Sequence, residues 1–178
     1  DVAATHFYNE QTGEYHLETD GVSLDRAGMI QRLLEWVERY PIVSIEDPLF
    51  EDDWEGWRTL ADRLETVQLL GDDFLVTDRE RLDRAIDAEA ATAVLVKMNQ
   101  AGTITRTIDV MERAMDAGLS TVVSARSGET CDSTMADLAV AYGAGQLKVG
   151  SLARSERLAK YNRLFEIENE RDPTLSTF

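Results

Sequence analysis

Short apolar segments alternate regularly with amphipathic ones along this chain, with a repeat of roughly 25 residues. The apolar segments are rich in Val, Ile and Leu without strict polar alternation, which is typical of strands buried on both faces. We expect strands at 41–47, 67–73, 92–99, 120–126 and 145–150. We expect helices at 23–39, 53–65, 78–88, 103–117, 132–143 and 153–169. Serial alternation of this kind predicts an α/β fold with a parallel sheet and right-handed crossovers.

Several of these helices have recognisable boundaries. Ser23 precedes the first one and is expected to cap it, because a serine hydroxyl can accept a hydrogen bond from the first helical turn. Pro41 follows the same helix and cannot continue it. Gly118 closes the fourth helix, since glycine readily adopts the left-handed conformation found at helix ends.

A charged residue stands at the C-terminal end of each predicted strand. These residues are Glu46, Asp72, Lys97, Arg126 and Lys148, at intervals of 26, 25, 29 and 22 residues. An open doubly wound sheet binds ligands mainly at one switch point, whereas a barrel gathers the ends of many strands around one axis. The regular placement of charge therefore favours a barrel.

Asp1 stands 45 residues before Glu46 and would end one further strand, with one helix and a long loop between them. This makes six (βα) units, fewer than the eight of a complete barrel. A six-unit arc leaves two unpaired edges, so we do not expect this segment alone to form a closed, stable barrel. Because it starts on Asp1 without a signal peptide, we interpret the chain as a segment of a longer protein.

The composition excludes several classes of partner. The chain has 34 acidic and 18 basic residues and a net charge of −16, which disfavours nucleic acid and anionic membranes. Its apolar runs are of strand length, far shorter than a membrane span requires. The single cysteine, Cys131, precludes an internal disulfide and fits a reducing compartment. We therefore expect a soluble, cytoplasmic protein.

Lysine is scarce in this chain. Lys97, Lys148 and Lys160 are the only lysines, against fifteen arginines. An acidic, lysine-poor surface is what we expect in a high-salt cytosol, where screening removes the self-repulsion; a genome that favours arginine codons is the alternative. Under either reading, the remaining lysines are candidates for positions that arginine cannot fill, because only lysine is a compact amine that can release its proton.

Three of the strand-end residues are carboxylates from different strands: Asp1, Glu46 and Asp72. Carboxylates that converge at one edge repel one another unless a cation lies among them, and an all-oxygen ligand set suits Mg²⁺. Asp73 is a rival to Asp72 as a ligand. The alternative interpretation is that these acids cap helices or pair with arginine.

Lys97 and Lys148 directly follow apolar residues and should stand at strand ends near such a metal. A nearby cation and desolvation both favour the neutral amine, which suits a general base. A Schiff-base lysine would have the same pattern, and so would a lysine whose head group reaches solvent.

Arg126, with Ser127 and Ser124 beside it, forms a group of hydrogen-bond donors suited to phosphate or carboxylate. A divalent metal, an amine base and an anion-binding group are the components required for proton abstraction next to a carboxylate. In that chemistry the metal stabilises the enolate and the amine takes the proton.

Several motifs resemble the C-terminal barrel of enolase, the phosphopyruvate hydratase of glycolysis, in the same order and at similar spacing. They are "DVAATHFY", "SIEDP", "LLGDD", "LVKMNQ", "SARSGET", "GQLKVG" and "RSERLAKYN". The resemblance implies the (βα)₆ portion of a ββαα(βα)₆ TIM-like barrel whose N-terminal capping domain is absent from this segment. It covers residues 1–170, and we treat 171–178 as a tail.

The resemblance also implies residue roles in the dehydration of 2-phosphoglycerate, a phosphorylated hydroxy acid, to phosphoenolpyruvate. Asp1, Glu46 and Asp72 would bind Mg²⁺, and Lys97 would abstract the C2 proton. Lys148 would bind the substrate carboxylate, and Arg126 and Ser127 its phosphate. A homodimer or higher homo-oligomer is the expected assembly.

The chain departs from the family pattern at two positions. Ala125 replaces an active-site histidine, and His6 stands where the family usually has glutamate. The upstream acids and the mobile loop of the family also lie outside this segment, so we expect the isolated segment to be inactive. An enolase-like paralogue that acts on another carboxylate and a non-catalytic relative are the alternative functions.

Overall fold

The computed structural model describes residues 1–171, which form two compact units. The first comprises residues 1–76 and 80–93, and the second comprises residues 77–79 and the chain from residue 94. The predicted alternation of strands and helices is confirmed: five strands of one sheet follow in the order of the chain, β4-β5-β6-β7-β8. The predicted tail, 171–178, lies outside the described residues except for Arg171, the last residue of a helix.

The first unit begins with a small element that the sequence did not predict. Residues 8–22 were expected to lie in a long loop and residues 23–24 at the start of the first helix, but residues 8–24 form a three-stranded antiparallel sheet in the order β1-β2-β3. Tyr15 lies at its centre, opposite Tyr8 on one side and Leu24 on the other, and is fully buried. The elements are the 3₁₀ helix η1 (Ala4–Phe7) and the strands β1 (Tyr8–Asn9), β2 (Glu14–Leu17) and β3 (Val22–Leu24).

The helix that follows starts later than predicted. Its N-cap is Asp25, whose side chain accepts a hydrogen bond from the Gly28 N–H, whereas Ser23 belongs to β3. Both residue types can cap a helix, but Ser23 is paired with His16 in the β2–β3 ladder, so the helix cannot start there. The predicted end is confirmed, because α1 (Arg26–Arg39) stops at Tyr40, directly before Pro41.

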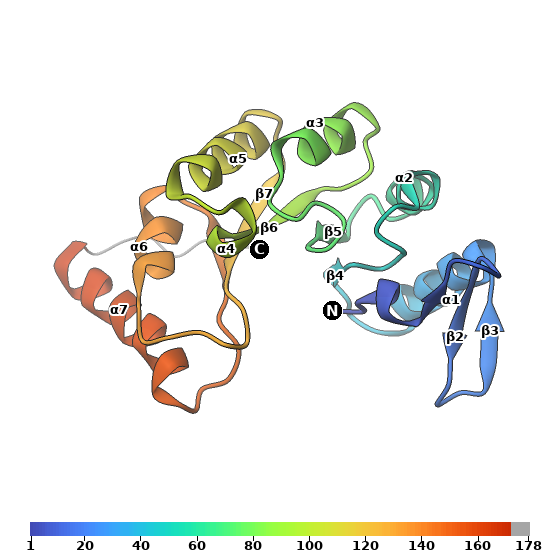
Figure 1. Cartoon of the computed structure of the whole chain (residues 1–178), viewed down its shortest axis with the longest axis horizontal. Helices are drawn as coiled ribbons and strands as arrows, with labels where there is room; N and C mark the ends of the chain where they lie inside the picture. Colours follow the sequence, from blue (N-terminus) through green and yellow to red (C-terminus); the bar gives the residue numbers. More distant parts are fainter. Residues whose placement is uncertain (172–178) are drawn as a thin grey trace. The chain divides into compact units, whose positions relative to one another are not determined.

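The rest of the first unit brings two parallel strands together. Strand β4 pairs with β5 so that Glu46 lies opposite Leu70. The stacked rings of Trp57 and Phe74, with centroids 4.0 Å apart, are buried in its core. The elements are β4 (Ser44–Glu46), α2 (Trp54–Arg63) and β5 (Gln68–Gly71), followed by α3 (Arg79–Asp87), most of which belongs to this unit (Figure 1).

The second unit continues the alternation. All five residues of β6 are buried, as expected for a strand covered on both faces. Helix α5 ends at Asp116 with Ala117 as its C-cap, and Gly118 follows with a φ of 81°, which confirms the predicted stop. The elements are β6 (Ala93–Lys97), α4 (Met98–Ala101), α5 (Ile104–Asp116), β7 (Ser120–Ser124), α6 (Thr134–Ala141), β8 (Gly145–Lys148) and α7 (Ser155–Arg171).

Strands β7 and β8 form a parallel pair in which Ser124 lies opposite Lys148. Helix α6 contacts both strands and also packs against α7, beside which it lies in Figure 1. Arg163 of α7 fastens this helix pair, because its guanidinium lies 2.7 Å from the carboxylate of Asp137 on α6.

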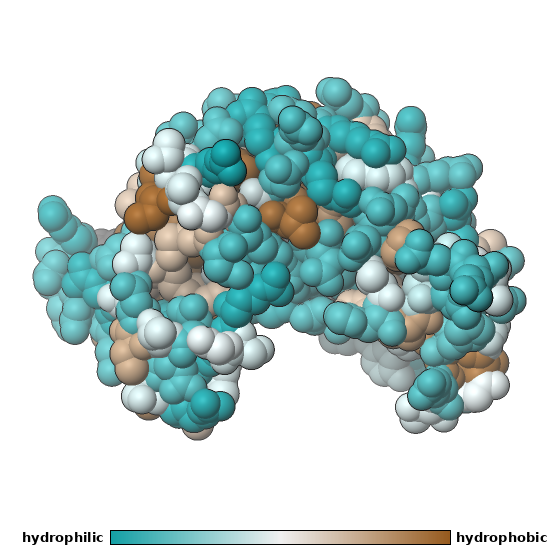
Figure 2. Space-filling model, viewed as in Figure 1, coloured by the Kyte–Doolittle hydropathy of each residue, from teal (hydrophilic) through white to brown (hydrophobic). Residues whose placement is uncertain are grey.

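The face of the molecule seen in Figure 2 is mostly polar. On this face, hydrophobic residues occupy small separate areas. Across residues 1–171, none of the helices has both the length and the apolar character that crossing a membrane would require.

Candidate active site

Two of the predicted metal ligands meet in the first unit. Glu46 ends β4 and Asp72 follows β5, and the parallel register of these strands brings their ends to the same edge. Glu46, Asp47 and Asp72 each offer a carboxylate oxygen, and these three oxygens lie within 4.8 Å of one another. All three residues are buried, with exposed fractions of 3–8%. A buried set of carboxylate oxygens fits a hard divalent cation such as Mg²⁺.

Asp47 holds this cluster in place, and the sequence interpretation missed it. Its carboxylate accepts hydrogen bonds from the backbone N–H groups of Asp72 at 2.9 Å, Asp73 at 2.8 Å and Phe74 at 3.4 Å. Burial raises the pKa of Asp47 to about 6; the hydrogen bonds from the Asp73 and Asp72 N–H groups oppose the rise, and the charges of Asp72 and Asp73 add to it. Both oxygens of Asp47 already accept backbone hydrogen bonds, so this residue stabilises the turn after β5. Glu46 and Asp72 are therefore the better candidate ligands.

Asp1 is placed next to the cluster by its backbone. The Val2 N–H donates to the Glu46 carbonyl at 2.9 Å, and the Ala4 N–H donates to the Asp47 carbonyl at 3.1 Å. The start of the chain therefore runs beside the end of β4, and η1 follows directly; that Asp1 ends a further strand stays a prediction. The Asp1 side chain is exposed, and its role as a ligand stays a prediction.

Lys97 ends β6 in the second unit and is 6% exposed. Its backbone N–H donates to the Thr77 hydroxyl oxygen at 2.9 Å, and that hydroxyl lies 2.7 Å from the side-chain oxygen of Gln100. Thr77 has a φ of 49°, which is unusual for a β-branched residue. The residue before α4 is thus held by a threonine twenty positions earlier, which no local pattern indicated.

Lys148 ends β8, beside the end of β7. The Ser124 hydroxyl donates to the Lys148 carbonyl at 3.0 Å, so it fixes the two strand ends to each other. This differs from the expectation that Ser124 would serve as an anion donor, because its single O–H is directed to the backbone. Lys148 itself is half-buried.

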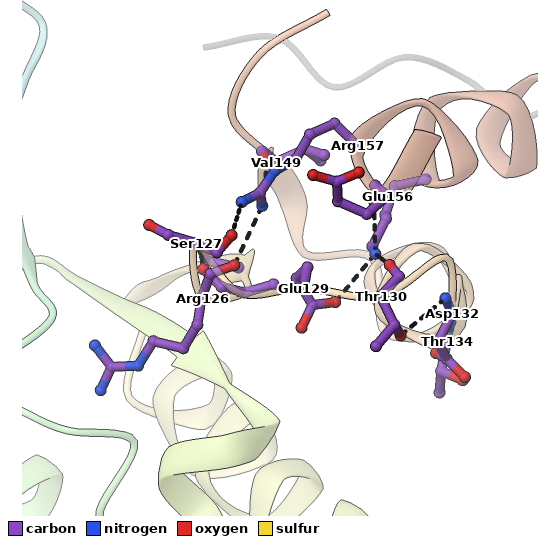
Figure 3. Close-up of polar contacts among 12 residues, drawn as sticks. Arg126, Ser127, Glu129, Thr130, Asp132, Thr134, Val149, Glu156 and Arg157 are labelled. Carbon is purple, nitrogen blue, oxygen red and sulfur yellow. Dashed lines mark hydrogen bonds and ion pairs between the residues drawn. The ribbon is translucent and has the colours of Figure 1, made fainter. Parts of the chain in front are cut away.

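The segment after β7 carries the predicted phosphate-binding residues. Ala125 is half-buried directly after the strand, and Arg126 and Ser127 are exposed. Their backbone carbonyls accept hydrogen bonds from Arg157 of α7 at 3.2 and 2.6 Å (Figure 3). The Arg126 side chain extends away from Arg157 in the same view. The loop therefore uses its backbone for anchoring and presents an arginine and a serine at its surface.

The family of the chain follows from a comparison with protein-family models. Residues 1–175 match the model described as the C-terminal TIM barrel domain of enolase. The chain belongs to this family. The predicted enolase resemblance is thereby confirmed, and the α/β alternation is that of an enolase-type TIM barrel segment, as the spacing of strand-end charges had indicated. The individual roles of the site residues in this enolase domain stay predictions.

Replacing Asp47 with asparagine tests its role in the acidic cluster of this enolase domain. Asp47→Asn turns one acceptor oxygen into an NH₂ group that faces backbone donors, so at least one N–H loses its partner. We expect the free energy of unfolding to fall by about 1–3 kcal/mol without added metal, measured by urea denaturation.

Asp62→Asn is the matched control, because its carboxylate on α2 is 62% exposed. This control should change stability by less than about 0.5 kcal/mol. Equal effects of the two substitutions would contradict the anchoring role of Asp47.

Proposed function

We propose that this chain carries active-site strands of an enolase that dehydrates 2-phosphoglycerate to phosphoenolpyruvate. The observation that carries the proposal is Lys97, a buried lysine at the end of a barrel strand in a chain of the enolase family. Sites of the enolase superfamily use a lysine or histidine base with one or two Mg²⁺ ions. A place in glycolysis and a cytoplasmic location accompany this proposal.

In the proposed reaction, Lys97 takes the proton from C2, next to the substrate carboxylate, and the C2–C3 double bond forms as the C3–O bond breaks. The hydroxyl leaves as hydroxide and takes up a proton to give water. Lys97 is 6% exposed at the end of β6, so its amine lies in a site from which most water is excluded. Lys148 pairs with the carboxylate, and Arg126 and Ser127 hold the phosphate through charge-assisted hydrogen bonds. These contacts orient the substrate so that the C2 proton faces the amine.

Mg²⁺ would be held by Glu46 and Asp72, with Asp1 as the third carboxylate, and when bound it supplies positive charge that stabilises the enolate. The support for this assignment is the convergence of buried carboxylate oxygens in the first unit. Without a cation these acids repel one another, so metal binding should also stabilise the fold.

The base is tested by Lys97→Met in the full-length protein that contains this sequence. We expect turnover of 2-phosphoglycerate to fall by roughly 10²- to 10⁴-fold, because general base catalysis typically contributes that much. Phosphoenolpyruvate absorbance at molar KCl with Mg²⁺ measures the rate. Arg106→Met, which removes an exposed cation from α5, should leave the rate unchanged. No turnover by the unaltered protein would refute the proposal.

The metal assignment is tested by stability rather than by activity. Mg²⁺ at a hundred times its Kd should raise the free energy of unfolding by about 2.7 kcal/mol. Glu46→Gln or Asp72→Asn should remove most of this gain, whereas Glu51→Gln, which changes an acid outside the cluster five residues after Glu46, should retain it. Chemical denaturation with and without Mg²⁺ makes the comparison, and an undiminished Mg²⁺ response in Glu46→Gln would exclude the site.

A second candidate function is supported by Ala125, which stands where the enolase family has a histidine beside the substrate. The smaller side chain would widen the site and suit a different carboxylate substrate. Under the enolase proposal, Ala125→His should raise turnover of 2-phosphoglycerate by about 10²-fold or more, since one lost transition-state donor typically costs 10²- to 10³-fold. No gain in the same absorbance assay would favour the paralogue.

A further inference from the structure

Lys160 is the one lysine to which the proposed reaction assigns no role. It lies on α7, and its side chain is fully buried. Its ammonium group donates to the Thr130 carbonyl at 2.5 Å and the Glu156 carbonyl at 2.8 Å, and lies 3.0 Å from the Glu129 carboxylate. In Figure 3, dashed lines from the labelled residues Glu129, Thr130 and Glu156 meet at one nitrogen. All three donors of the ammonium are therefore used.

Two of these partners belong to the loop that carries the predicted phosphate-binding residues. Glu129 and Thr130 follow Arg126 and Ser127 by only a few positions. A buried ammonium needs a charged or hydrogen-bonded partner, and Glu129 supplies the negative charge. Lys160 on α7 thus fixes the C-terminal half of the loop through Glu129 and Thr130.

Arg157, three positions before Lys160 on the same helix, fixes the N-terminal half. Its guanidinium donates to the carbonyls of Arg126 and Ser127 at 3.2 and 2.6 Å. It also donates to the Val149 carbonyl at 3.0 Å, directly after Lys148. One arginine therefore joins the loop after β7 to the end of β8, the two places from which the predicted anion ligands come.

We propose that Arg157 and Lys160 are positioning residues for the anion-binding loop, 125–130. They hold the loop by its backbone carbonyls, so that the side chains of Arg126 and Ser127 stay directed at the phosphate of the substrate. Neither residue touches the substrate in this scheme. The inference rests on the proposed function for the identity of the substrate, but the holding of the loop can be measured without turnover.

The scarcity of lysine supports this role. An acidic chain that uses fifteen arginines keeps a lysine at a fully buried position with three acceptors around it. A compact ammonium can donate to three acceptors that surround it, whereas a planar guanidinium is larger and donates only within one plane. The sequence hypothesis that each remaining lysine fills a position unsuited to arginine agrees with this site.

The test compares Arg157→Met, Lys160→Met and the control Arg163→Met in the full-length protein, below the unfolding transition of each variant. Arg163 is a suitable control because it lies on the same helix and bonds Asp137 of α6 rather than the loop. The readouts are hydrogen–deuterium exchange of the amides in 126–130 and the Kd of inorganic phosphate by calorimetry.

We expect Arg157→Met and Lys160→Met to speed exchange in the loop and to weaken phosphate binding by about tenfold or more, while Arg163→Met changes neither. If Lys160→Met does not fold, the result for Arg157→Met tests the inference by itself. Arg157 is only partly buried, so its replacement should not prevent folding. Lower thermal stability with unchanged loop exchange and phosphate affinity would overturn the inference, as would an unaltered protein that does not bind phosphate. Phosphate binding that responds as expected in a protein without 2-phosphoglycerate turnover would refute only the proposed function.

Discussion

The acidic cluster depends on one buried carboxylate that is bonded to the backbone. Asp47 accepts hydrogen bonds from the N–H groups after β5, donates its own N–H to the Leu70 carbonyl, and receives the Ala4 N–H at its carbonyl. The start of the chain, the end of β4 and the turn after β5 therefore meet at one residue. Held in this way, Glu46 and Asp72 stay close, and with Asp47 they form a buried carboxylate cluster compatible with a divalent metal site.

In the second unit, too, side chains that bond to the backbone hold the residues of the proposed site in place. The residues with proposed roles on the substrate are placed by backbone hydrogen bonds from side chains elsewhere: Thr77 holds the backbone of Lys97, Ser124 that of Lys148, and Arg157 those of Arg126 and Ser127. A side chain bonded to a carbonyl or N–H restrains the main chain without occupying the functional group of the residue it holds.

The longer strands and helices were predictable from the sequence, whereas the short antiparallel strands β1 to β3 were not. Strands such as β6 and helices such as α5 were predicted to within a few residues, because buried apolar runs and amphipathic turns give strong signals. Strands β1 to β3 span only two to four residues, too few for alternation to appear, so the sequence predicts a loop and the start of a helix in their place. Ser23 and Asp25 are both good helix caps, and only the pairing of β3 decides between them.

The sequence by itself determined where strands end and which charged residue stands at each end, because hydrophobic periodicity is a local property of the chain. Its motifs also determined the family. The tertiary structure decided which polar groups bond to one another, because those partners are separated by about 20 to 31 residues and meet only after the strands have paired. Arg126 and Lys160 illustrate the difference: both are cations in polar segments, yet packing exposes one and buries the other.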